Sequence, residues 1–336
     1  MPTLSGRFVR AAFTGLLTAA LAGLAGPAPA MASVVASFAT LSQHADGTHR
    51  SPHTWLPGSA KAPASTIMCA KVAAKAGFSF TTTVATSAGA QPQIVVAIAV
   101  AMAESSCTPR AKNVNDDGSV DRGLWQLNDR YHSEVSDSCA YQIQCNANAA
   151  WTVSSHGAKW SPWSAYNNGS WKTYLASASN AISGGFTFLL GNQGAGTCLA
   201  ADRADHSDGA AVWQMSCDPA DGYQQWTVTS TAGAAPILRN LGTGTCLAWD
   251  SAKTGNGARV FQRACAAGDA DQQFAFLGTG RLNVAGEADA LMQNVRSGAC
   301  LDADSSAISN TSATARNGKP PRQWTCSKDD RYQMWN

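Results

Sequence analysis

Two carboxyl residues, Glu104 and Asp121, stand seventeen positions apart in segments of opposite character. Glu104 closes an apolar helical pattern, whereas Asp121 lies in a turn-rich segment that then becomes strand-like. A carboxyl group that ends an apolar helix is partly desolvated, and desolvation favours its protonated form. Glycoside hydrolysis needs such a division, because one acid protonates the leaving oxygen while a second carboxylate supports the developing cation. The pair therefore predicts a glycosidic-bond-cleaving site, with Glu104 as general acid.

Each carboxyl group also has a simpler interpretation. Glu104 considered alone is more typical of a surface residue at a helix end. The Asp121 segment imitates the start of a calcium-binding loop, but its twelfth position, which requires a bidentate Glu, is Leu124. A turn at Asp117-Gly118 that links two strands is therefore favoured over calcium. No metal and no cofactor is expected.

The elements that must position this pair are mainly helical and extend from residue 64 to about residue 175. Ala64 to Ala76 is one predicted helix. Gln91 to Ser105 is a second, with Pro92 in its first turn and apolar residues at helical spacing. Asn146 to Ser154 is a third, shorter helix.

The carboxyl segment resembles the active-site stretch of chicken-type lysozymes. The match includes Glu104-Ser105, Asn115, Asp117-Gly118-Ser119, Asp121, Gly123, Gln126 and Asn128, together with the interval between the two acids. The resemblance implies that Glu104 is the proton donor and that Asp121 is the nucleophile or ion stabiliser. It also implies that Gln126 and Asn128 contact the sugar.

Two further motifs resemble those of soluble lytic transglycosylases, which share the lysozyme-like fold. They are Gly123-Leu124-Trp125-Gln126, with Trp in place of the usual Met, and Ser164-Ala165-Tyr166-Asn167-Asn168-Gly169. Those enzymes generally lack the second carboxylate, and the substrate's own N-acetyl group attacks to give an anhydro-sugar. This resemblance implies that Tyr166 and Asn167 are cleft residues, whereas Trp151 and Trp160 are expected in the core. Hydrolysis and transglycosylation both remain open.

Ten cysteines predict an oxidising compartment and up to five disulfides. Cys139 and Cys145 are close enough to pair across a short loop. Cys69 then pairs with Cys107, tying the first helix to the end of the Glu104 helix. A thiol nucleophile is not favoured, because nothing distinguishes one cysteine among an even number.

The first 32 residues are typical of a cleaved signal peptide, with Arg7 and Arg10, an apolar run, and Ala30-Met31-Ala32. No later stretch is long and apolar enough to span a bilayer, so a secreted extracellular protein is expected. The formal net charge is only +2, without a basic stripe or polybasic cluster. This charge pattern argues against nucleic-acid and membrane partners.

Two segments are predicted to be linkers. Residues 33–63 are rich in Ala, Ser, Thr and Pro without a lasting period. A solvated linker is favoured over a metal site for its histidines, His44, His49 and His53. Residues 176–185, made mainly of Ala, Ser, Asn and Gly, are predicted to join two domains.

Residues 186–336 contain three similar units. Each begins with a Gly-x-Cys-Leu segment and ends with Gln-x-Trp or Gln-x-Phe. The first two units keep a 48-residue offset at three positions, which are Cys198/Cys246, Cys217/Cys265 and Gln224/Gln272. Such periodicity indicates a repeat architecture. We call the units lobes one, two and three.

The repeats resemble the ricin-type β-trefoil lectin fold. The resemblance implies the disulfides Cys198–Cys217, Cys246–Cys265 and Cys300–Cys326, and core positions for the terminal aromatics Trp226, Phe274 and Trp335. A sugar site in this family usually combines an Asp directly after Cys-Leu with an aromatic residue two positions before the second Cys. Lobe three alone keeps both, as Asp302 and Trp324, so a single competent site is expected there. Asp202 and Asp250 are the alternatives in the other lobes, and Trp213 and Trp249 are undecided.

The sequence thus predicts a multidomain chain, with a mainly helical α+β lysozyme-like domain at 64–175 and an all-β trefoil at 186–336. The leading hypothesis is a monomeric secreted muramidase that cleaves the β-1,4 MurNAc–GlcNAc bond, with peptidoglycan or another polysaccharide as its partner. The lectin domain would hold the enzyme near its polymer. The alternative is a non-catalytic carbohydrate-binding protein with a vestigial lysozyme-like domain.

Overall fold

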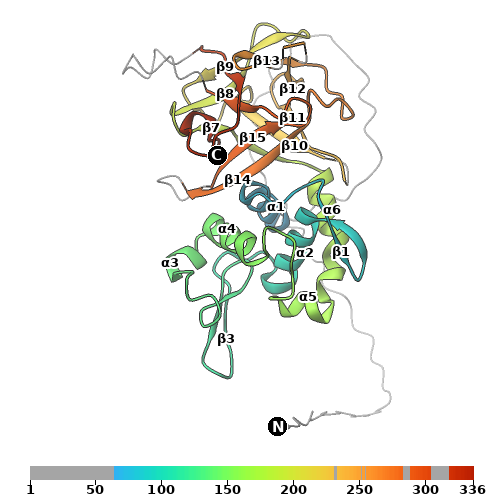
Figure 1. The fold of residues 1–336 in the computed structure, drawn as a ribbon, viewed down its shortest axis with the longest axis vertical. Coiled ribbons are helices and arrows are strands. Elements are labelled where there is room, and N and C mark those ends of the chain that lie inside the picture. Colours follow the sequence, from blue (N-terminus) through green and yellow to red (C-terminus); the bar gives the residue numbers. More distant parts are fainter. Residues whose placement is uncertain (1–63, 231–232, 251, 254, 283–287, 304–317) are drawn as a thin grey trace, which may run out of the picture. The chain divides into compact units, whose positions relative to one another are not determined.

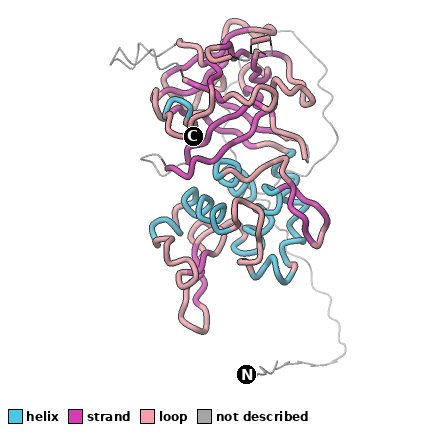
Figure 2. Tube along the Cα trace, in the orientation of Figure 1, coloured by secondary structure: helices cyan, strands magenta, loops and turns pink. Residues whose placement is uncertain are grey.

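The computed structural model describes residues 64–230, 233–250, 252–253, 255–282, 288–303 and 318–336. The predicted signal peptide, the linker at 33–63 and its three histidines lie outside these residues. Within them, no helix is long and apolar enough to cross a membrane. The described residues divide into a helix-rich region and a β region, as predicted (Figure 1, Figure 2).

The helix-rich region contains six α-helices and two small sheets among the described residues. The helices are α1 (Ala64–Ala76), α2 (Gln93–Ser105), α3 (Asp137–Ala140), α4 (Ile143–Val153), α5 (Ser164–Asn168) and α6 (Leu175–Ser183), with a 3₁₀ helix at Ser170–Tyr174. One sheet is the hairpin β1 (Thr83–Thr86) with β2 (Gly89–Pro92). The other is antiparallel and contains β3 (Lys112–Val114), β4 (Val120–Arg122) and β5 (Leu127–Asn128).

The predicted helices form, with corrections at their ends. Helix α2 begins at Gln93 because Gln91 pairs with Val84 in the β1–β2 hairpin. Helix α4 begins three residues before the predicted Asn146, where the Gln142 side chain accepts a hydrogen bond from the backbone N–H of Cys145. Such side-chain acceptors satisfy a free N–H of the first turn.

The segment predicted as an interdomain linker, residues 176–185, is mostly helix α6 instead. Composition suggested a linker because Ala, Ser and Asn dominate the segment. However, Ala178, Ala181 and Ile182 recur at three- and four-residue spacing and are all buried. Burial of an apolar face stabilises a helix that propensity alone would leave marginal.

The β region forms one curled sheet. Its strands are β6 (Phe186–Leu189), β7 (Gly191–Asn192), β8 (Thr197–Ala201), β9 (Ala210–Met215), β10 (Gln225–Thr229), β11 (Ile237–Asn240), β12 (Cys246–Trp249), β13 (Ala258–Arg263), β14 (Phe274–Leu282), β15 (Ala288–Asn294), β16 (Cys300–Asp302) and β17 (Arg322–Trp324). A 3₁₀ turn, Arg331–Gln333, precedes the last aromatic residue. Each lobe contributes one central hairpin, which is β8–β9, β12–β13 or β16–β17.

The aromatic residues predicted for the trefoil core are buried. Trp226 and Phe274 have no exposed surface, and Trp335 is 2% exposed. The indole N–H groups of Trp226 and Trp335 donate to the carbonyls of Leu199 and Leu301, at 2.9 and 2.8 Å. In lobe one and in lobe three, this bond connects the end of the lobe to its own start. Of the two undecided tryptophans, Trp249 is buried and Trp213 is half-buried.

Five disulfides connect the described residues. Cys69–Cys107 and Cys139–Cys145 lie in the helical region. Cys198–Cys217, Cys246–Cys265 and Cys300–Cys326 each close one lobe. These are the predicted pairings. A loop of roughly 20 residues closed by one disulfide stabilises the fold by about 3 kcal/mol in the chain-entropy model.

Candidate active site

Helix α2 places Glu104 at the edge of a core of buried apolar side chains. Its residues from Ile94 to Ala101 are at most 2% exposed, so the helix is buried on all sides rather than along one stripe. The helix ends directly after Glu104-Ser105, where Ser106 takes a left-handed conformation and donates to the Met102 carbonyl at 2.9 Å. The Cys69–Cys107 disulfide then holds this end against α1. Glu104 is therefore fixed in position by its own helix end.

Two contacts orient the Glu104 segment. The backbone N–H of Ala165, in the first turn of α5, donates to Glu104 Oε1 at 3.1 Å. The Ser105 hydroxyl donates to the Leu124 carbonyl at 2.7 Å. Burial raises the pKa of Glu104, the Ala165 hydrogen bond partly opposes that rise, and the negative charge of Asp121 adds to it. A raised carboxyl pKa is what a general acid needs near neutral pH.

The β3–β4–β5 sheet places Asp121 among amide donors. Asp121 lies on the central strand, directly opposite Asn113 on β3 and Asn128 on β5. Both neighbours donate to its carboxyl group, Asn113 at 3.2 Å and Asn128 at 2.7 Å, and Asn115 adds a third bond at 3.0 Å. In all these contacts the carboxyl oxygens are acceptors, as those of a carboxylate are. The sheet register thus supplies a second carboxyl group, which is held by three side-chain amides.

A second layer of polar contacts holds these amides. The Ser119 hydroxyl accepts from Asn115 and Asn128 at 3.2 and 3.0 Å and donates to Asp117 Oδ1 at 2.6 Å. The Ser119 hydroxyl and backbone N–H together lower the pKa of Asp117, and its Arg130 partner adds to the effect. The turn at Asp117-Gly118 links β3 to β4, as predicted. The loop that imitates a calcium site is therefore engaged with itself and with Asp121.

Both carboxyl groups line one cleft of about 700 Å³. Four of the six site residues predicted in this domain line it, namely Glu104, Asp121, Gln126 and Asn128. Gln126 has a left-handed backbone, and its amide donates to the Gly123 and Ala111 carbonyls at 2.7 and 3.2 Å. Further lining residues include Asp116, Tyr131, His132, Pro162, Trp163 and Ser164. Most of the residues that line the cleft have polar side chains that can form hydrogen bonds.

The other two predicted cleft residues, Tyr166 and Asn167, are not among the residues that line this cleft. The Tyr166 ring stacks on Trp171, with ring centroids 5.1 Å apart, and is half-buried. The Asn167 amide donates to the Ser161 carbonyl at 2.9 Å. Their motif instead supplies the Ala165 N–H that contacts Glu104. Trp160 is buried as predicted, whereas Trp151 is half-buried and packs against His156 in a tilted arrangement, with ring centroids 3.9 Å apart.

Arg122 is a supporting residue that sequence reasoning missed. Its side chain is only 4% exposed and contacts the carbonyls of Leu127 and Val135 at 3.2 and 2.9 Å. It also reaches the His132 carbonyl at 3.3 Å and forms an ion pair with Asp137 at 2.8 Å. One guanidinium thus organises the chain that carries Asn128 and the cleft rim. An Arg beside an Asp in a turn-rich segment carries no periodic signal that would reveal this burial.

Replacing Arg122 by Met should lower the free energy of unfolding by about 2–4 kcal/mol, because three carbonyl groups lose a charged donor. Urea unfolding followed by circular dichroism measures the change. The matched control is Arg130→Met. Arg130 is 54% exposed and pairs with an exposed Asp117, so its loss should cost less than about 1 kcal/mol. Equal losses in the two variants would show that Arg122 does not organise this segment.

Lobe three of the trefoil keeps the predicted acid and aromatic residue. Cys300 lies opposite Trp324 in the β16–β17 hairpin, and Asp302 is two residues further on the same strand face. The Gln333 amide donates to Asp302 Oδ2 at 3.0 Å. Trp324 is 44% exposed, an unusual exposure for so large an apolar side chain. An oriented carboxyl group and an exposed ring therefore lie diagonally across one hairpin.

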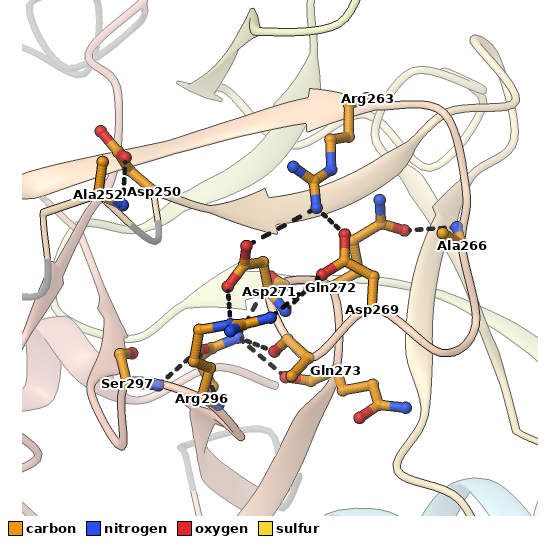
Figure 3. Close-up of polar contacts among 12 residues, drawn as sticks. Asp250, Ala252, Arg263, Ala266, Asp269, Asp271, Gln272, Gln273, Arg296 and Ser297 are labelled. Carbon is orange, nitrogen blue, oxygen red and sulfur yellow. Dashed lines mark hydrogen bonds and ion pairs between the residues drawn. The ribbon is translucent and has the colours of Figure 1, made fainter.

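Lobe two has an ion cluster at the corresponding place (Figure 3). Arg263, at the aromatic position, pairs with Asp269 and reaches Asp271 at 3.8 Å. Arg296 contacts Asp271 from the next lobe, with Nε 2.5 Å from Oδ1. Ala248 replaces the acid. Lobe one has Ala200 and Met215 at the two positions, so neither lobe retains the pair that lobe three keeps.

Comparisons with known proteins match two segments of the chain. Residues 82–165 match the family described as "Lysozyme like domain", and residues 187–274 match the family described as "Ricin-type beta-trefoil lectin domain". A search of the curated proteins finds no match. Among solved structures, the designed threefold-symmetric protein ThreeFoil is 25% identical, over 45% of this chain and 96% of that one, with a TM-score of 0.37. A Macrolepiota procera ricin B-like lectin in complex with lactose is 20% identical, over 45% and 94% of the two chains, with a TM-score of 0.34.

The helix-rich region with its two small sheets and the curled β region agree with the two family matches. The chain contains a lysozyme-like domain, matched over residues 82–165, followed by a ricin-type β-trefoil lectin domain, matched over residues 187–274.

Proposed function

We propose that this protein is a secreted muramidase, which cleaves the β-1,4 bond between N-acetylmuramic acid and N-acetylglucosamine in peptidoglycan. The observation that carries the proposal is one cleft holding two carboxyl groups in contrasting surroundings. Glu104 has a pKa raised by burial, and Asp121 accepts hydrogen bonds from three amides. The domain boundaries we propose are residues 64–175 for catalysis and 186–336 for binding, with export directed by residues 1–32.

In this mechanism the Glu104 carboxyl gives its proton to the glycosidic oxygen as the C1–O bond breaks. The positive charge that develops on the sugar ring is stabilised by the Asp121 carboxylate, which either attacks C1 or remains an ion partner. Glu104, now ionised, takes a proton from the incoming water, whose oxygen bonds to C1 and, where Asp121 has attacked, displaces the Asp121 oxygen from C1. This returns both carboxyl groups to their starting states. The amides of Asn113, Asn115 and Asn128 keep Asp121 oriented throughout.

A lytic transglycosylase reaction is the second candidate, because the motif Ser164-Ala165-Tyr166-Asn167-Asn168-Gly169, which resembles that of those enzymes, supplies the Ala165 N–H that donates to Glu104. In that reaction Glu104 gives its proton to the leaving glycosidic oxygen, while the substrate's N-acetyl oxygen attacks C1 and the C1–O bond to the leaving sugar breaks. The 6-hydroxyl then displaces the N-acetyl oxygen and gives up its proton to Glu104, so the product is an anhydro-sugar. Asp121 would then serve only to organise the β3–β4–β5 sheet.

Mass spectrometry of the fragments released from purified peptidoglycan distinguishes these reactions. Reducing-end muropeptides identify a lysozyme and assign Asp121 a chemical role. Anhydro-muramyl fragments identify a lytic transglycosylase. If the native protein releases neither, the function is carbohydrate binding with a vestigial lysozyme-like domain. Glu104→Gln, assayed in parallel, guards against a contaminating hydrolase.

We further propose that the trefoil domain retains the enzyme on its polymer, through Asp302 and Trp324 of lobe three. Asp302→Ala should weaken binding to insoluble peptidoglycan by about 10-fold or more, because a charged acceptor of sugar hydroxyls is lost. Binding is measured by depletion from solution in the inactive Glu104→Gln background. Asp218→Ala, an exposed acid on the same domain, is the control and should bind normally. Unchanged binding by Asp302→Ala would refute the assignment of the site to lobe three.

A further inference from the structure

Lobe one carries an acid–aromatic pair that is displaced by two residues from the pair in lobe three. In lobe three the aromatic residue lies opposite Cys300, and the acid is two residues beyond Cys300. In lobe one Trp213 lies opposite Ala200, and Asp202 is two residues beyond Ala200. The register offset between acid and ring is therefore the same in the two hairpins. The lobe-one pair lies one pleat, roughly 7 Å, further along its hairpin.

The two side chains of the lobe-one pair are in contact. Trp213 Nε1 donates to Asp202 Oδ2 at 3.1 Å. The other carboxyl oxygen, Oδ1, accepts from the backbone N–H groups of Ala204 and Asp205 at 2.9 and 3.3 Å. Both side chains remain half-buried rather than fully enclosed. The carboxylate is thus held in one orientation beside an accessible indole, before any ligand arrives.

Lobe two shows how such a pair looks when its ring is covered. Phe261 lies opposite Ala248, and Asp250 is two residues beyond Ala248, so the displaced pattern repeats at the 48-residue offset. There, however, Arg259 places its guanidinium over the Phe261 ring, 5.8 Å from the centroid. A hydrogen bond from Arg259 to the Gly209 carbonyl, 2.9 Å long, fixes it. The counterpart of Arg259 in lobe one is Ala211, which is too short to cover a ring.

The remaining aromatic residue near the lobe-one pair is already occupied. The Arg203 guanidinium lies over the Tyr223 ring, 4.9 Å from its centroid, and pairs with Asp221 at 2.5 Å. The His206 ring is 6.0 Å from the same Tyr223 ring. Of these two rings, Tyr223 and Trp213, it is therefore Trp213 that is left for stacking. A pyranose presents one apolar face to such a ring and hydroxyl donors at its edge to a carboxylate.

We propose that Asp202 and Trp213 form a second carbohydrate site, which binds a neutral pyranose unit in lobe one. Asp202 accepts hydrogen bonds from sugar hydroxyls, and the indole of Trp213 stacks on the sugar ring. The protein then holds a polysaccharide at two places on one domain, and its retention reflects both contacts. This inference rests on the carbohydrate binding proposed for the trefoil, but not on the cleavage reaction.

The test uses the full chain with Glu104→Gln and Asp302→Ala, and purified peptidoglycan as the probe. Adding Ala211→Arg should place an arginine over Trp213, as Arg259 covers Phe261, and weaken residual binding by about 5- to 10-fold. Leu241→Arg is the matched control, because it adds the same charge at a 58% exposed position of the same domain. That variant should bind as its parent does.

A second variant addresses the folding of this loop. Asp202→Asn keeps an oxygen that can accept from Ala204 and Asp205 but loses the charge, and it should weaken binding to a similar degree while the melting temperature stays near that of the parent. If the parent, Ala211→Arg and Asp202→Asn chains all bind equally, the lobe-one site is refuted. Turnover by the chain with native Glu104 is measured separately, so loss of the proposed activity and loss of this site can be told apart.

Discussion

Glu104→Gln should lower the rate of peptidoglycan cleavage by about 10²- to 10⁴-fold, the usual contribution of a general acid. The amide is nearly the same shape as the carboxyl group and keeps an oxygen that can accept from the Ala165 N–H. It has no proton to give to the leaving oxygen. Release of soluble muropeptides from purified peptidoglycan measures the effect, with the melting temperature as evidence of intact folding.

The matched control is Glu134→Gln, which makes the same chemical change at a side chain that is 66% exposed. It should retain full activity. Cleavage by Glu104→Gln at the native rate would reject Glu104 as the acid. So would equal losses in the two variants.

The same assignment fixes the direction of the pH dependence. The reaction needs Glu104 protonated, so activity is present below the pKa of Glu104 and is lost as pH rises through it. Burial raises that pKa, so this loss should occur at a higher pH than an exposed glutamate would give. If the activity instead falls at the pH where an ordinary exposed carboxyl group ionises, this result would contradict the conclusion that burial raises the pKa of Glu104.

Both carboxyl groups of the pair and most of their direct neighbours could be predicted from the sequence, because the motif is local. Between residues 104 and 128, the spacing of acids, amides and glycines already identifies the helix end and the turn. The lobes were predictable for a related reason. Their Cys pairs and terminal aromatics recur in register, so one unit's pattern supports the next.

What the sequence did not predict depends on contacts between distant segments. Tyr166 lies in a motif that matches cleft residues, yet its ring packs on Trp171 because of the direction in which α5 leads into the following 3₁₀ turn. The burial of Arg122 depends on carbonyl groups contributed as far away as Val135. Helix α6 has a linker's composition and is stabilised by burying three apolar side chains. Local propensity cannot predict any of these arrangements.

Gly123→Ala should destabilise the helical domain by about 3–5 kcal/mol, among the larger effects of a single methyl group. Gly123 has a φ of +75°, where a side chain is strained. A Cβ there would lie 2.0 Å from the Ala140 carbonyl oxygen and 2.6 Å from Asn146 Nδ2. The amide of Asn146 bonds to the Arg122 carbonyl and to the Trp125 N–H, at 3.1 and 2.9 Å. Displacing it therefore separates α4 from the strand that carries Asp121.

Gly118→Ala separates the two causes of this loss. Gly118 has a similar φ of +80°, but a Cβ there would meet nothing within 4 Å. Its replacement should cost only the backbone strain, about 1–2 kcal/mol. Urea unfolding followed by the helical circular dichroism signal gives both values. Equal losses in the two variants would mean that Asn146 and the Ala140 carbonyl move aside at no cost. Because the methyl group at residue 123 acts two positions from Asp121, the larger stability loss should be accompanied by reduced peptidoglycan cleavage, whereas Gly118→Ala should remain active.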